Sequence, residues 1–133
     1  MRIFAPGFRL SVVDIAVLVV GFPVSVALAT VEWTWGFVVA FVLAHFFLFC
    51  NVVRMARPLE LVWATMFTVQ AGSTIVAGLP GWIITTTVSL ATTLIVVAIE
   101  MRKPSYHGIA WQRINPNLQV WWETHIANRS NRR

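Results

Sequence analysis

The chain has 133 residues, of which 58% are hydrophobic and only 11% are charged. Soluble domains carry about 25% charged residues and disordered chains are more polar still, so the composition argues against both classes. The formal charge is +5 at pH 7, and the single cysteine, Cys50, rules out an internal disulfide framework and a cysteine-based zinc site.

Four apolar stretches are long enough to cross a bilayer, because about 20 helical residues span the hydrocarbon layer. The sequence therefore predicts an all-α integral membrane protein, with a four-helix bundle over residues 1–103. The expected spans are residues 10–30, 36–53, 59–79 and 82–99.

The first span holds one acid, Asp14, about one turn inside its apolar run. Charged groups near a span end usually snorkel to the interface or pair there, and this interpretation is favoured. The functional alternative is an ion path through Asp14 and Gln70 of the third span. Four spans with an acid in the first resemble the small multidrug transporters in architecture, but in that family the acid is a mid-helix glutamate.

In the second span, His45 lies near the middle, with Phe41 and Phe49 one helical turn away on either side. In the favoured interpretation, neutral His45 joins an intramembrane polar network with Gln70 and Ser89, which lie at matching depth. In the alternative, His45 is an axial ligand to a haem or a chlorophyll-type pigment that lies against the two phenylalanines. The chain offers no second mid-membrane histidine for a bis-histidine haem.

The third and fourth spans are rich in small and hydroxyl residues, which let helix backbones approach closely in lipid. We expect them to pack as a tight antiparallel hairpin around Pro80-Gly81. The residues concerned are Ala64, Thr65, Thr68, Ala71, Gly72 and Ser73 in the third span, and Thr85, Thr86, Thr87, Ser89, Thr92 and Thr93 in the fourth.

After the spans, residues 104–133 are expected to form a cytoplasmic tail with an amphipathic helix over residues 116–128. Asn115-Pro116 is a typical helix start. One helical face then carries bulky apolar side chains, which suits either the membrane surface or docking onto a larger partner. The residues of this interfacial face are Leu118, Trp121, Trp122 and Ile126.

The basic residues predict the orientation of the spans. All ten lie before the first span, between the second and third, or after the fourth, and the other two loops have none. The positive-inside rule therefore places both termini in the cytoplasm.

The sequence has no phosphate-binding glycine loop, HExxH, GxSxG or CxxC motif, so no enzyme activity is expected. The leading prediction is a non-enzymatic membrane subunit that assembles with itself or with a larger membrane protein complex. The alternatives are a small channel or transporter and a pigment-binding subunit that uses His45. Lipids and other membrane subunits are the expected partners, nucleic acid is not, and a bacterial protein of this kind would lie in the inner membrane.

Overall fold

The computed structural model describes residues 4–130, with side chains as far as residue 125, and these residues form helices and no strand. Four helical segments are long and apolar enough to cross a membrane, which confirms the all-α, multi-pass membrane class. The elements are α1 (Val12–Val31), α2 (Trp33–Phe47) with its π-helical continuation η1 (Leu48–Val53), α3 (Arg57–Ala77), α4 (Trp82–Met101), α5 (Trp111–Ile114) and α6 (Leu118–Ser130).

Local chemistry explains where the helices begin and end. Ser11 caps α1 in a capping box, because its side chain accepts from the Asp14 backbone N–H while the Asp14 carboxylate accepts from the Ser11 backbone. Pro58 stands in the first turn of α3, where its missing N–H costs nothing. Gly78 ends α3 in the left-handed conformation, at φ 72°.

The link between the first two spans is shorter than predicted. The predicted spans leave residues 31–35 between them, but α1 runs to Val31, α2 begins at Trp33, and only Glu32 lies between the helices. The Glu32 carboxylate accepts from the Thr34 hydroxyl at 3.1 Å and from its backbone N–H at 3.4 Å. The acid therefore acts as the N-cap of α2, a role that a hydropathy boundary does not reveal.

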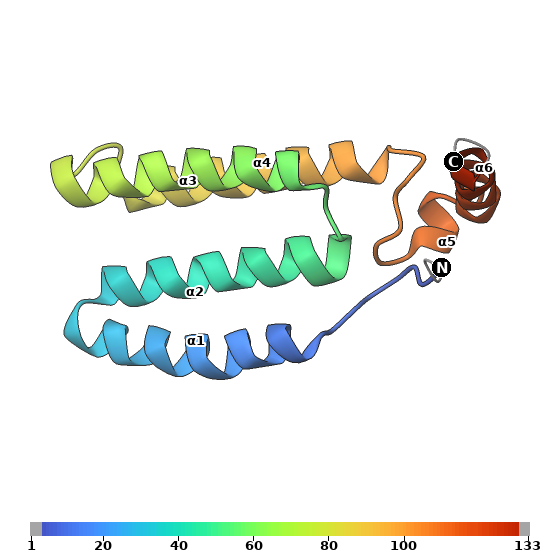
Figure 1. Ribbon diagram of the computed structural model, residues 1–133. Coiled ribbons are helices and arrows are strands. Elements are labelled where there is room, and N and C mark those ends of the chain that lie inside the picture. Colours follow the sequence, from blue (N-terminus) through green and yellow to red (C-terminus); the bar gives the residue numbers. More distant parts are fainter. Residues whose placement is uncertain (1–3, 131–133) are drawn as a thin grey trace.

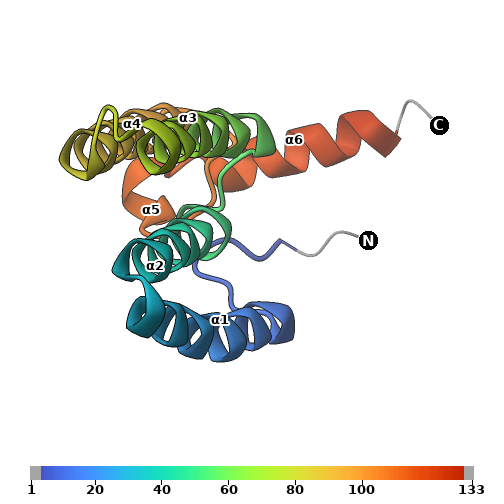
Figure 2. The same ribbon diagram turned by 90° about the vertical axis from the view of Figure 1, so that its left-hand side faces the viewer.

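The helices form two hairpins, α1–α2 and α3–α4 (Figure 1). Seen along the helices, α2 lies between α1 and the α3–α4 pair (Figure 2). Helix α1 packs substantially only on α2 and buries a single residue, Ser25. The sequence predicted a four-helix bundle, and within it the four spans form an open arrangement in which α1 contacts mainly α2, because hydropathy reports only that a helix is apolar and not which neighbours it has.

Small and hydroxyl residues close each hairpin. In α1–α2, a side chain on Gly36 would collide with Ala29, and the Ser25 hydroxyl donates to the Gly36 carbonyl at 2.8 Å. In α3–α4, the hydroxyls of Thr74 and Thr85 lie 3.0 Å apart in a buried hydrogen bond. The predicted antiparallel packing of α3 on α4 is confirmed, and α1–α2 is a second tight hairpin that the sequence analysis did not single out.

Beyond α4 the chain folds back toward its own N-terminal segment, at one end of the membrane-spanning helices (Figure 1). The backbone N–H of Ile109 donates to the Val52 carbonyl at 2.8 Å, and that of Gly7 donates to the His107 carbonyl at 2.8 Å. The first part of the tail is therefore joined to both η1 and the N-terminal segment.

Candidate functional site

His45 lies at the centre of the contact between the two hairpins. Its ring stacks on Trp63 with centroids 4.2 Å apart, lies 4.3 Å from the Phe41 ring, and is only 6% exposed. Its Nδ1 lies 2.8 Å from the Phe41 carbonyl oxygen, within its own helix. Phe49 meets it edge-on at 5.7 Å, as the spacing along α2 predicts. These side chains, with Phe67, form the aromatic core that joins α2 to α3.

Trp63 is the residue of this site that sequence reasoning missed. It lies about one turn into the third span, where a tryptophan is typical of the membrane interface, but it is 3% exposed. Its indole N–H donates to the backbone carbonyl of Ser89 on α4 at 3.1 Å. Trp63 therefore connects His45 on α2 to α4 through one stack and one hydrogen bond. The signal available was its position on the same face of α3 as Phe67 and Ala71, which recur at helical spacing.

The predicted network of His45, Gln70 and Ser89 is joined only in part. The Gln70 amide donates within its own helix, to the Met66 carbonyl at 3.5 Å. Ser89 contributes its backbone carbonyl rather than its hydroxyl, and its buried Oγ has no hydrogen-bond partner in the described part of the chain. An indole thus supplies the interhelical hydrogen bond that the sequence assigned to polar side chains.

The geometry around His45 fits a packing role better than axial ligation of a macrocycle. Phe41 and Trp63 lie close to the ring, and Nδ1 is already within bonding distance of a carbonyl. A haem or a chlorophyll-type ring would have to approach Nε2 at a residue that is almost fully buried, and so would displace aromatic side chains of the core. The pigment alternative stays a prediction for spectroscopy.

Asp14 takes part in a polar cluster at the end of α1. Its Oδ2 accepts from the Ser11 backbone N–H at 2.7 Å and from the Ser11 hydroxyl at 2.6 Å. Asn51 of η1, which is 2% exposed, turns its amide nitrogen toward the same Oδ2 at 2.9 Å and toward the Arg9 carbonyl. The backbone N–H of Arg9 in turn donates to the Asn51 carbonyl at 3.3 Å.

This cluster connects α1 to the second span, and Asn51 was not singled out from the sequence. A π-helical turn such as η1 is uncommon and is frequent at functional positions, and here it presents the buried amide to Asp14. Asp14 and Gln70, the two residues of the predicted ion path, lie on α1 and α3, which share no substantial contact. The structure does not bring them together.

The tail docks through two fully buried side chains, Tyr106 and Leu118. The Tyr106 hydroxyl donates to the Ile109 carbonyl at 2.9 Å, and burial raises the pKa of this phenol. The hydroxyl is therefore a neutral donor over the physiological pH range. Gly108 lies so close to the Val53 carbonyl that a Cβ there would collide with it.

The predicted interfacial face of the tail helix is divided between protein contacts and the surface. Leu118 is buried within the protein, and Trp122 meets Phe4 of the N-terminal segment at a centroid distance of 5.6 Å. Trp121 stacks on His125 at 4.0 Å. The side chain of Ile126 lies outside those that the structure describes. Helix α6 runs over Leu118–Ser130, close to the predicted 116–128.

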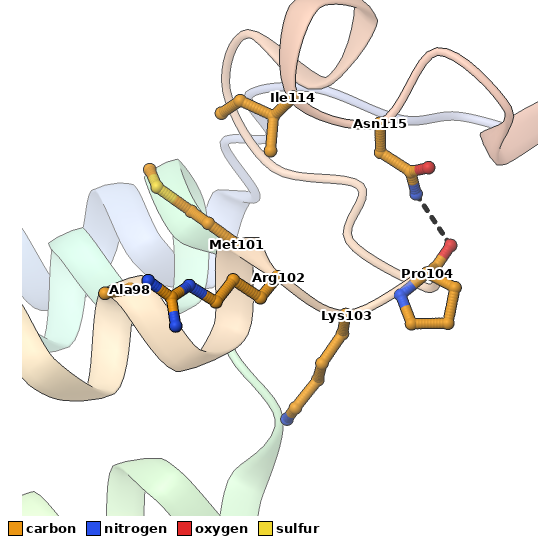
Figure 3. Close-up of a pocket in the computed structure, with 7 residues that line it drawn as sticks. All are labelled: Ala98, Met101, Arg102, Lys103, Pro104, Ile114 and Asn115. Carbon is orange, nitrogen blue, oxygen red and sulfur yellow. Dashed lines mark hydrogen bonds between the residues drawn. The ribbon is translucent and has the colours of Figure 1, made fainter.

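A shallow groove of about 560 Å³ lies where α4 passes into the tail (Figure 3). Two of its polar side chains are engaged within the chain. Lys103 forms an ion pair with Glu100 at 2.6 Å, and the Asn115 amide donates to the Pro104 carbonyl at 2.6 Å. The groove therefore marks a stabilised turn.

Across residues 4–130, no group of three or more His, Cys, Asp and Glu side chains could hold a metal ion. Comparisons with protein-family models, with curated proteins and with solved structures found no match to this chain.

Proposed function

We propose that the protein is a non-enzymatic, multi-pass membrane subunit that assembles with copies of itself or with a larger membrane protein complex. Both termini face the cytoplasm, and in a bacterial cell the membrane is the inner one. The orientation is supported by the positive-inside rule, since the termini lie at the same end of the spans in Figure 1 and the loops at the other end carry no Lys or Arg.

The observation that carries the assembly proposal is the open side of α3 at Gly72. A methyl group added to Gly72 would meet no atom within 4 Å, whereas one added to Gly36 or Gly21 would collide with the neighbouring helix of the α1–α2 hairpin. Gly72 therefore contributes nothing to packing inside this chain. A glycine costs a helix about 0.8–1.0 kcal/mol relative to alanine, so its presence on an open membrane face favours close approach by another helix.

The surface around Gly72 supports the same proposal. Val69 and Val76, one turn to either side on the same face, are 66% and 88% exposed. A shallow groove of about 530 Å³ continues along α3 past Thr65 and Leu61. In lipid, helices whose backbones come close often meet at a glycine that has larger apolar side chains beside it, as Gly72 has Val69 and Val76.

The test compares the assembly of the natural chain with that of Gly72→Leu. Leucine has room within the protein and is a better helix former, so the variant should insert and fold normally. The matched control is Ala91→Leu, on the exposed side of α4. Native mass spectrometry after gentle extraction should give the natural chain and the control masses well above the 14.9 kDa of one chain, and G72L a mass near 14.9 kDa.

The composition of the complex decides between the two forms of assembly. An integer multiple of the chain mass means a homo-oligomer, and foreign subunits mean a larger complex. A natural chain that stays monomeric in native-like lipid contradicts the proposal, as does a G72L complex of unchanged size.

A further inference from the structure

A cavity of about 150 Å³ lies between the N-terminal segment, the turn after η1 and the tail. Aromatic rings of Phe4 and Trp122 form one part of its lining, and Arg9, Arg54 and His107 form another. These residues come from the N-terminal segment, the turn after η1 and the tail, and all lie outside the membrane-spanning helices. The cavity equals about five water molecules in volume, taking about 30 Å³ for each.

The two arginines bring two positive charges to a cavity whose lining contains no acidic residue. Burial lowers the pKa of the Arg54 guanidinium, and the nearby charge of Arg9 lowers it further. Among the described side chains the one ion pair is Lys103 with Glu100, away from this cavity. The carboxylate of Asp14 lies near Arg9 but is engaged by Ser11 and Asn51. Two like charges held together in this way are stabilised when an anion binds between them.

The cavity also offers hydrogen-bond donors. Arg54 donates to the Ala5 carbonyl at 2.6 Å and to the Gly7 carbonyl at 3.5 Å, and both bonds use Nη1. A guanidinium has five N–H donors, so most of those of Arg54 are not used by these bonds. The Nδ1 of His107 donates to the Ser105 carbonyl oxygen at 2.9 Å, so the Nε2 of the neutral ring is an acceptor and the donors of the cavity are the guanidinium groups.

We propose that this cavity is a phosphate-binding site, in which the guanidinium groups of Arg9 and Arg54 hold the anion beside His107 and Trp122. Guanidinium groups match the oxygens of phosphate in pairs. Basic pockets beside membrane spans on the cytoplasmic side bind phospholipid headgroups. The phosphate can belong to an anionic phospholipid or to a soluble phosphate, because both present the same oxygens. The site is independent of Gly72 and of assembly.

The test uses the full chain and two charge-neutralising variants. Arg9→Gln is the principal variant, because the side chain of Arg9 is exposed and the hydrogen bond to Asn51 uses its backbone. Arg54→Gln is the second, although it also removes the bonds to Ala5 and Gly7. The matched control is Arg113→Gln, which removes the same charge from an exposed position on α5. A melting curve for each protein checks that it folds.

The first arm measures the retention of phosphatidylglycerol against phosphatidylcholine by native mass spectrometry, from detergent that contains equal amounts of each. The second arm measures the rise in melting temperature with inorganic phosphate against chloride at constant ionic strength. A lipid headgroup site gives selective phosphatidylglycerol retention, which R9Q weakens about tenfold and R113Q leaves unchanged. A soluble phosphate site gives a rise in melting temperature that R9Q removes and R113Q keeps.

Either pattern supports the proposal and names the source of the phosphate. The proposal is overturned if the folded natural chain shows neither effect, or if R9Q and R113Q behave alike.

Discussion

At the scale of single residues, the aromatic side chain of Trp63 makes the interhelical hydrogen bond that the sequence assigned to polar side chains. His45 drew attention because a lone histidine in a span is costly to bury. In the structure, Trp63 covers its ring and makes the hydrogen bond to Ser89 on α4. Both residues thus hold the two hairpins together.

We expect Trp63→Phe to lower the free energy of unfolding by about 2 kcal/mol, because it removes one interhelical hydrogen bond and leaves a void in the core.

His45→Leu should lower the free energy of unfolding by about 1 kcal/mol, since it removes a bond within its own helix and one stack. Denaturation in mixed detergent micelles measures both. Trp35→Phe is the control, because Trp35 is 50% exposed at the far end of α2, and equal losses in W35F and W63F would contradict the assignment.

The same variants test the pigment alternative. An absorption spectrum of gently extracted natural protein should show no Soret or chlorophyll-type band, because the His45 ring is enclosed by aromatic side chains. A visible band that disappears in H45L while the protein stays folded would make His45 a ligand.

At the scale of elements, η1 brings the end of the second span into contact with the start of α1. A continuous α-helix over the second span would place Asn51 differently, whereas the wider π-helical turn brings its amide to the Asp14 carboxylate and the Arg9 carbonyl. Loss of the Asn51 amide would leave the Asp14 carboxylate and the Arg9 carbonyl with one donor fewer each.

Asn51→Leu should therefore destabilise the α1–α2 hairpin by about 1–2 kcal/mol, because it removes the two hydrogen bonds that the buried Asn51 amide donates. The effect should be local. Hydrogen exchange should rise at residues 9–14 and stay unchanged in the α3–α4 hairpin. Gln70→Leu is the matched amide control, because Gln70 bonds only weakly within its own helix, and an equal loss there would show that the Asn51 contact is not special.

At the scale of the whole molecule, the tail is part of the folded body. Tyr106 and Leu118 are fully buried, and backbone hydrogen bonds join the tail to η1 and to the N-terminal segment. The tail also completes the cavity that Arg9 and Arg54 line.

Ending the chain after Lys103 should leave membrane insertion intact, because all four spans are kept. It should lower the melting temperature by several degrees, since it uncovers Val53 and removes the partners of Gly7 and Val52. It should also abolish selective phosphatidylglycerol retention and weaken assembly, both read by native mass spectrometry. A truncated chain that melts, retains lipid and assembles as the full chain does would show that the docked tail has no such role.

The sequence by itself determined the class of the protein and the number of its spans, because hydrocarbon tolerates only long apolar helices and such helices are visible in hydropathy alone. It also determined the start of α1 and both ends of α3, where Ser11, Pro58 and Gly78 act through local backbone chemistry.

Only the tertiary structure decided which helices touch. Lipid is as apolar as a leucine side chain, so hydropathy carries no record of which face meets a neighbour. That is why the open side of α3 and the meeting of Asp14 with Asn51 could not be predicted. The cavity between Arg9 and Arg54 joins residues 45 positions apart, and only the return of the tail onto the N-terminal segment closes it.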